Sequence, residues 1–264
     1  MQKHEYIYNH RFEFECGKSL SSLRIVFHTS PLMKGEPPRD AACGRKVVWI
    51  CHALTANSDA EDWWSGLVGK GRVLDPDKYF IVCVNMLGSC YGSSGPSEMK
   101  PDGRGPYLLD FPEVTVRDMV RANILVREHL GIGEIDFLLG SSIGGFQAVE
   151  WLVTEPDIIG SALLMATSAR VTPWLTAWEE AQRMAIEADP TFRLLLERNE
   201  CEGAFAQFHS ETSEPRADVF LRGGQAGLKA ARAVALLSYR SYAGYNATQA
   251  ESGDDTLFAG RAAS

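Results

Sequence analysis

The sequence predicts an α/β fold in which helices cover both faces of a mostly parallel β-sheet. Short β-rich segments alternate along the chain with segments of helical periodicity, which is typical of this class. Four of the β-rich segments are continuous apolar runs, as expected of central parallel strands, and each ends in a polar or glycine-rich loop. These runs span residues 46–51, 79–85, 135–140 and 161–166.

The loops that follow these runs are expected to form one site, because ligands of open α/β sheets bind beyond the carboxyl ends of the strands. They span residues 52–59, 87–96, 140–145 and 167–173. Two earlier segments, 12–16 and 23–29, alternate in hydrophobicity and are predicted to form an antiparallel pair.

Helical periodicity is clearest at 118–130, where apolar residues recur every three or four positions after possible N-caps at Thr115 and Asp118. Further helices are predicted at 144–154, 174–187 and 225–240, and no strand pattern appears after Ala169. We therefore predict an α/β core at 1–169, a helical lid insertion at 170–245, and a polar tail at 246–264 where the core is expected to resume.

Composition narrows the function classes. The net charge of −8 and pI near 5.3 argue against a general preference for nucleic acid or anionic membranes. No apolar stretch reaches the roughly 18 to 20 residues that span a bilayer, and the first ten residues are polar, so we expect a cytoplasmic protein. The six cysteines show no C-x-x-C spacing and are expected to be reduced structural thiols.

Residues 140–144, Gly-Ser-Ser-Ile-Gly, match the G-x-S-x-G pattern directly after an apolar run and directly before a helix. A sharp strand-to-helix turn there would hold Ser142 in strained geometry with its hydroxyl exposed, and the flanking glycines would let neighbouring backbones approach. The alternative is a plain glycine-serine turn. Because strand, helix and register all fit, Ser142 is predicted to be a nucleophile.

An acyl-transfer serine needs two amide donors for the developing oxyanion, and the Ile143 and Leu54 N–H groups are the candidates. The alternative for Leu54 is an ordinary loop with a buried leucine. His52 lies beside this loop, but a histidine at a strand end is more often a structural hydrogen-bonding group than a general base.

Arg232 is predicted to lie on an inward stripe of its helix, because Leu228 and Leu236 lie four residues to either side and Tyr239 falls on the same face. A buried arginine needs a partner: an internal carboxylate, or a substrate carboxylate held in a two-point clamp. Snorkelling to solvent is the third option.

A base and an acid for Ser142 are not evident. His209 is the only histidine after Ser142, and no strand precedes it. None of the aspartates that follow Ser142 sits just past a predicted strand; they are Asp157, Asp189, Asp218, Asp254 and Asp255.

Several segments together resemble the homoserine O-acetyltransferase family of methionine biosynthesis, within the α/β-hydrolase superfamily. They are VWICHALT (48–55), DWW (62–64), YFIV (79–82), LGSCYG (87–92), GSSIGG (140–145), EW (150–151), IEADP (186–190), and the stretch from GL (227–228) through SYR (238–240). The resemblance runs along almost the whole chain.

The resemblance implies an acetyl transfer from acetyl-CoA, the co-substrate, to L-homoserine through an acyl-enzyme on Ser142, with no bound cofactor and no metal. Leu54 and Ile143 would frame the oxyanion hole. Arg232 would bind the amino-acid carboxylate, with Thr55 and Tyr239 also in the substrate site, and the lid helices could form a homodimer.

Two departures from the family pattern are visible. Ile143 replaces the methionine that usually follows the nucleophile, a mild change because the backbone N–H acts. Family members also continue past the last residue here with two strands, the triad aspartate and histidine, and a substrate-binding aspartate. We therefore expect the last strands to be missing, the run 161–166 to be an exposed sheet edge, and turnover to be impaired. The alternatives are a serine esterase of the same fold and a non-catalytic remnant.

Overall fold

The computed structural model describes residues 1–32, 42, 44–103, 105–192 and 224–248. The chain forms two compact units. The first unit comprises residues 1–100 and 106–169, and the second comprises 101–105 and 170–264. The lid and tail predicted from the sequence include residues outside the described ranges, so that domain assignment stays a prediction.

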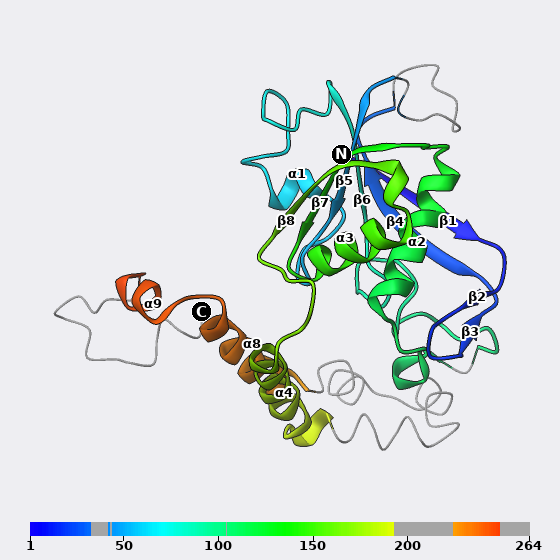
Figure 1. Cartoon of the computed structure of the whole chain (residues 1–264). Coiled ribbons are helices and arrows are strands. Elements are labelled where there is room, and N and C mark those ends of the chain that lie inside the picture. Colours follow the sequence, from blue (N-terminus) through cyan, green and yellow to red (C-terminus); the bar gives the residue numbers. More distant parts are fainter. Residues whose placement is uncertain (33–41, 43, 104, 193–223, 249–264) are drawn as a thin grey trace, which may run out of the picture. The chain divides into compact units, whose positions relative to one another are not determined.

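A six-stranded sheet forms the centre of the first unit (Figure 1). Its central strands pair in parallel, and an antiparallel pair closes one side. The order is β1 (Gln2–Tyr8), β4 (Leu23–Thr29), β6 (Tyr79–Val84), β5 (Lys46–Cys51), β7 (Ile135–Ser141) and β8 (Ile159–Met165). The four predicted central strands are therefore confirmed, although β8 starts two residues earlier than predicted.

The predicted pairing of 12–16 with 23–29 is wrong. The segment β2 (Phe12–Glu13) instead pairs with β3 (Ser19–Leu20) in a separate two-stranded sheet, while β4 pairs with β1 and β6. The strand β1 was missed because its half-buried positions are His4, Tyr6 and Tyr8 rather than aliphatic residues.

Helices cover both faces of this sheet, as predicted. The helices α2 (Val116–His129) and α3 (Ile143–Thr154) contribute to one hydrophobic cluster, in which Trp49 and Trp151 meet edge to face with ring centroids 5.1 Å apart. The short helix α1 (Ala60–Trp63) and the segment after it pack in a second cluster with Val48 and Ile81. Two 3₁₀ turns, η1 (Leu108–Asp110) and η2 (Pro156–Ile158), lie in the connections.

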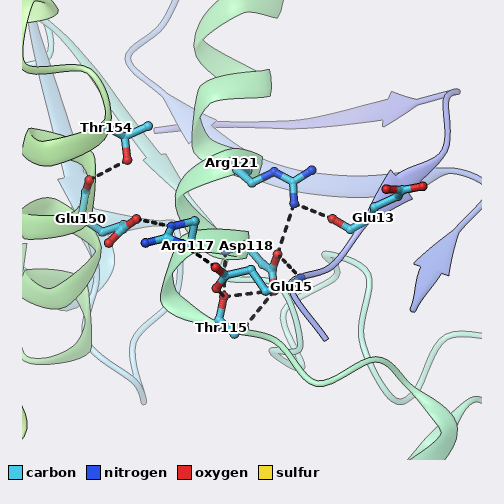
Figure 2. Close-up of polar contacts among 8 residues, drawn as sticks. All are labelled: Glu13, Glu15, Thr115, Arg117, Asp118, Arg121, Glu150 and Thr154. Carbon is cyan, nitrogen blue, oxygen red and sulfur yellow. Dashed lines mark hydrogen bonds and ion pairs between the residues drawn. The ribbon is translucent and has the colours of Figure 1, made fainter. Parts of the chain in front are cut away.

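A capping box starts helix α2. The Thr115 hydroxyl accepts from the Asp118 N–H at 3.2 Å, and the Asp118 carboxylate accepts from the Thr115 N–H at 3.1 Å (Figure 2). The predicted cap at Thr115 is confirmed, whereas Asp118 is the third helical residue rather than the cap. The fully buried Asp118 also accepts from the Glu15 N–H, so this box ties the segment after β2 to the helix.

The last strand in the sheet order, β8, has unusually exposed apolar residues. Leu163 and Leu164 are 52% and 41% exposed, whereas Trp49 and Ile50 in β5 are fully buried. Within the described residues β8 pairs only with β7. The expected exposed apolar edge is therefore present.

In the second unit, α4 (Pro173–Glu187) packs against α8 (Gln225–Ser238), and α9 (Tyr242–Thr248) follows. The buried residues of α8 are Gly227, Ala231 and Ala235. A side chain at Gly227 would come within 2.7 Å of the Ala185 carbonyl oxygen, so glycine permits a close helix contact there. Arg232 is exposed and lies off this face, so its predicted place on the inward stripe is wrong for the contact with α4.

The cysteines that the structure describes are free thiols. Cys51 and Cys83 are buried in neighbouring strands, and burial raises the pKa of the Cys51 thiol to about 12. A buried thiol with so high a pKa is a poor nucleophile, which supports a structural role. Cys43 and Cys201 lie outside the described residues. No described helix is both long and apolar enough to cross a membrane.

Candidate active site

Ser142 occupies a strained turn between β7 and α3. Its φ of 55° and ψ of −123° lie in a region that residues with a side chain rarely adopt, and its N–H donates to the Met165 carbonyl at 3.0 Å. Ser142 is exposed rather than packed in the core. The elbow predicted from the sequence motif is therefore present, and such strain at an exposed serine is typical of a functional position.

Three glycines make this turn possible. A Cβ at Gly140 would lie 2.5 Å from the Gly144 carbonyl oxygen, and one at Gly144 would lie 2.0 Å from the Cys51 carbonyl oxygen. A Cβ at Gly145 would lie 2.4 Å from the Thr167 side chain. Because no real Cβ tolerates such distances, these positions bring the loops after β5, β7 and β8 into contact at the start of α3.

The loop 52–59 after β5 carries the second predicted oxyanion donor. Leu54 is 65% exposed, so the buried leucine expected under the alternative of an ordinary loop is wrong. Gly144 abuts the backbone of Cys51 and His52, and His52 lies two residues before Leu54. Among the described residues, no acceptor pairs with the Leu54 or the Ile143 N–H. Their use in an oxyanion hole stays a proposal.

His52 has the environment of a structural histidine. Its side chain is 1% exposed, and burial lowers its pKa, so the ring is neutral near pH 7. The Nδ1 atom lies 2.8 Å from the Ala53 carbonyl oxygen; since a carbonyl only accepts, Nδ1 carries the proton. This arrangement favours the structural reading over general-base catalysis.

The predicted substrate residues divide between the two units. Thr55 is exposed in the first unit, beside Leu54, and its carbonyl accepts from the Tyr91 hydroxyl at 3.3 Å. Arg232 and Tyr239 are exposed in the second unit. Their roles as substrate ligands stay predictions.

The two described aspartates that follow Ser142, Asp157 and Asp189, are both unsuited to act as the triad acid. Asp157 lies in η2, at the amino end of β8, whereas Ser142 lies at the carboxyl end of the parallel strand β7. Asp189 is engaged by Thr191 and by the Gly227 N–H, and these hydrogen bonds lower its pKa to about 2. Neither carboxylate suits a triad. His209 and the later aspartates lie outside the described residues: Asp218, Asp254 and Asp255.

Residues that sequence reasoning missed lie in the loop after β6 and in the last residues of the first unit. In the sequence, Asn85 ends the apolar run 79–85 and Tyr91 lies in the segment 87–92, and neither pattern assigns the residue a role. Ala166 has a φ of 48°, which turns the chain so that Thr167 packs on Gly145. A polar residue that ends an apolar run, as Asn85 does, was the one available signal.

Among the described residues, no cluster of three or more side chains could hold a metal ion.

Comparison with known proteins gives a consistent family. A family model described as the alpha/beta hydrolase fold matches residues 46–196. Homoserine O-acetyltransferase from Nostoc punctiforme is 41% identical over 182 residues, which cover 69% of this chain and 49% of that protein. The same enzyme from Cyclobacterium marinum is 36% identical over 226 residues, with 86% and 56% covered. The chain thus spans about half the length of the curated relatives it matches.

Solved structures share the fold. Homoserine O-acetyltransferase from Bacillus anthracis superposes with a TM-score of 0.73 at 21% identity, over 96% of this chain and 64% of that one. The acetyl esterase MekB gives a TM-score of 0.69 at 23% identity, over 94% and 62%. At this identity the likeness shows the fold and not the activity. The chain belongs to the α/β-hydrolase fold family, and within it the sequence is similar to homoserine O-acetyltransferases.

Proposed function

We propose that this polypeptide carries the acylation site of an acetyltransferase that moves an acetyl group from acetyl-CoA to L-homoserine through Ser142. The observation that supports this most strongly is the exposed, strained Ser142 at the start of α3, two residues before Gly144, which abuts the backbone of Cys51 and His52. The similarity to homoserine O-acetyltransferases supports the choice of substrates.

In the proposed reaction the Ser142 hydroxyl oxygen attacks the thioester carbonyl carbon. The carbon–sulfur bond breaks, the serine proton passes to the departing thiol, and an acetyl-serine ester remains. The Leu54 and Ile143 N–H groups would donate to the oxyanion of the tetrahedral intermediate. The hydroxyl of homoserine would then attack the ester, regenerate the serine and complete a ping-pong cycle.

Arg232, Thr55 and Tyr239 are proposed as substrate ligands. A guanidinium can hold an amino-acid carboxylate through two parallel hydrogen bonds, and the exposed Arg232 side chain is available for such a contact. The carboxylate clamp is the one of the three sequence-based options that fits an exposed arginine and the family resemblance together.

We further expect slow turnover by this polypeptide alone. A serine hydroxyl is a weak nucleophile without a general base, and loss of triad members costs several orders of magnitude in rate. In the described part of the chain no histidine follows Ser142, and His52 is sealed in the core.

The test is to incubate the protein with acetyl-CoA, with and without L-homoserine, and to follow thiol release and acetylation of the peptide that contains Ser142. We expect an acetyl group on Ser142 and faster thiol release when homoserine is present. Release of acetate at the same rate without homoserine would point to an esterase instead. If a fluorophosphonate labels the wild type no faster than Ser142→Ala, the site is a non-catalytic remnant.

Self-association through the second unit is a separate proposal. The helix α8 carries exposed apolar side chains outside its contact with α4, including Leu228, Leu236 and Leu237. Such residues would be covered in a homodimer formed by these helices. Sedimentation of the wild type and of Leu237→Lys should show a dimer that the substitution weakens; an unchanged monomer in both would contradict it.

A further inference from the structure

Asn85 joins the two loops that follow the central strands β5 and β6. Its side chain is 2% exposed. The Oδ1 atom accepts from the Ser58 N–H at 2.7 Å, and Nδ2 donates to the Tyr91 carbonyl at 2.9 Å. The Asn85 main chain is also engaged, because its N–H donates to Val26 in β4 and its carbonyl accepts from the Ser93 hydroxyl.

On one side, Asn85 holds the second half of the loop 52–59. Ser58 is fully buried, and its hydroxyl lies 2.7 Å from Nδ1 of His28. The Trp63 indole N–H donates to the Asn57 carbonyl at 2.8 Å, so the loop is also tied to α1. If the Asn85 side chain were removed, the buried Ser58 N–H would lose its acceptor, which is costly in a protein interior.

On the other side, Asn85 fixes the loop 86–95. The same Tyr91 whose carbonyl accepts from Asn85 donates its hydroxyl to the Thr55 carbonyl at 3.3 Å. These hydrogen bonds form a closed loop with the backbone. Asn85 is bonded to Ser58, the backbone leads from Ser58 back to Thr55, and Thr55 is bonded to Tyr91. Tyr91 is in turn bonded to Asn85. Leu54, the proposed oxyanion donor, is the residue directly before Thr55.

A backbone amide stabilises an oxyanion only if it is held in place before the reaction, because a mobile donor must be ordered in the transition state. Leu54 itself is 65% exposed, so side-chain packing does little to fix it. Within the loop, the Ala53 carbonyl accepts from the Ala56 N–H at 3.0 Å and from His52 Nδ1 at 2.8 Å, which shapes the turn around Leu54. The hydrogen bonds of Asn85 and Tyr91 add the connection from this turn to the loop after β6.

We propose that Asn85 is a positioning residue for the Leu54 N–H: it fixes the loop after β5 to the loop after β6 without touching the substrate. The effect on catalysis rests on the proposed function of Ser142. The effect on loop order does not, and the two can be measured separately.

Two substitutions distinguish the contributions of the two side-chain hydrogen bonds of Asn85. Asn85→Ala removes both side-chain hydrogen bonds, whereas Asn85→Asp keeps an acceptor for the Ser58 N–H and places an oxygen against the Tyr91 carbonyl. The matched control is Asn123→Ala. Asn123 is also buried, at 3% exposure, and accepts from the Trp49 indole at 2.8 Å, but it lies in α2 and has no hydrogen bond to either loop.

The first measurement is amide hydrogen exchange of the full chain, read by mass spectrometry over peptides 52–59, 86–95 and 116–129. We expect Asn85→Ala to accelerate exchange in both loops by roughly 10-fold or more, and Asn85→Asp to do so mainly in 86–95. Asn123→Ala should accelerate exchange in 116–129 and leave the two loops unchanged. Unchanged loops in Asn85→Ala, or equal acceleration everywhere in both alanine variants, would overturn the proposal.

The second measurement is the rate at which p-nitrophenyl acetate acylates Ser142. We expect Asn85→Ala to lower the limiting rate by roughly 10- to 100-fold, with less than about a twofold change in the half-saturating concentration, because an oxyanion donor acts in the transition state. Asn123→Ala should keep the wild-type rate at a temperature where it is folded. If Ser142→Ala reacts as fast as wild type, the proposed function fails, while the exchange data still decide the role of Asn85.

Discussion

Two helices of the first unit begin at hydroxyl residues, and the two beginnings are opposites. At α2, Thr115 has extended backbone geometry, its side chain accepts from the Asp118 N–H, and Asp118 reciprocates. At α3, Ser142 has a φ of 55° and its side chain makes no capping hydrogen bond. The first helix start satisfies its own donors, whereas at the second the Ser142 hydroxyl and the Ile143 N–H have no hydrogen-bond partner among the described residues.

The surroundings reinforce this difference. Around α2, Arg117 donates to Glu15 at 2.7 Å and to Glu150 at 2.6 Å, and Arg121 donates to the Glu13 carbonyl (Figure 2). At the first turn of α3, the atoms closest to Gly144 and Gly145 are the backbone of Cys51 and His52 and the uncharged Thr167 side chain. The comparison teaches that local rules of helix capping are obeyed where the fold is stabilised and broken where chemistry is proposed.

The largest expected effect comes from the nucleophile itself. Ser142→Ala should lower acylation by p-nitrophenyl acetate to background without changing stability. Ser142→Gly should lose the same activity but raise the free energy of unfolding by about 1 kcal/mol, because glycine adopts this φ without strain. Urea titration of both variants checks this; equal stability of the two would contradict a strained turn.

The close approach at the start of α3 can be broken directly. Gly144→Ala would place a methyl group 2.0 Å from the Cys51 carbonyl oxygen, and we expect destabilisation of about 3 kcal/mol or more. Gly133→Ala is the matched control, since a Cβ there meets nothing within 4 Å. Thermal melts of both variants test the difference, and a harmless Gly144→Ala would mean that the loop after β5 is not packed on this helix.

Whether the sequence predicts a feature depends on how far apart along the chain the residues that form it lie. The elbow at Ser142 and the cap at Thr115 were predictable because each follows from a few consecutive residues. The face of α8 was assigned to Arg232 and its leucine neighbours because periodicity cannot reveal that small residues, such as Gly227, permit the closest helix contact. Asn85 was missed because its partners lie in three separate segments.

A smaller effect is expected at α2. Thr115→Ala removes the side-chain half of the capping box and should lower the free energy of unfolding by about 1 kcal/mol. Reactivity of Ser142 should not change. Thr154→Ala, which removes only a hydroxyl bond to the Glu150 carbonyl four residues back on α3, should be neutral within about 0.5 kcal/mol. Equal losses in both variants would remove the contrast between a cap and an ordinary helical threonine.

The smallest effect at neutral pH concerns a third helix start, that of α8, where the carboxylate of Asp189 accepts from the Gly227 N–H at 2.8 Å. Hydrogen bonds lower the Asp189 pKa from 3.8 to about 2. Because the pKa is lowered, the ionised Asp189 carboxylate stabilises the folded state fully above about pH 4. This contribution is lost as the pH falls through 2. Helical circular dichroism from pH 5 to pH 2 should show less acid dependence in Asp189→Asn than in wild type; identical curves would contradict this assignment.

The most direct test of the account is to label the protein with a fluorophosphonate and to follow the Leu54 and Ile143 N–H groups by nuclear magnetic resonance. We expect the label to attach to Ser142 and both amides to shift and become protected from exchange, because they donate to the phosphonyl oxygen. A label on another residue, or an adduct on Ser142 that leaves both amides unchanged, would contradict the claim that this helix start is an acyl-transfer site.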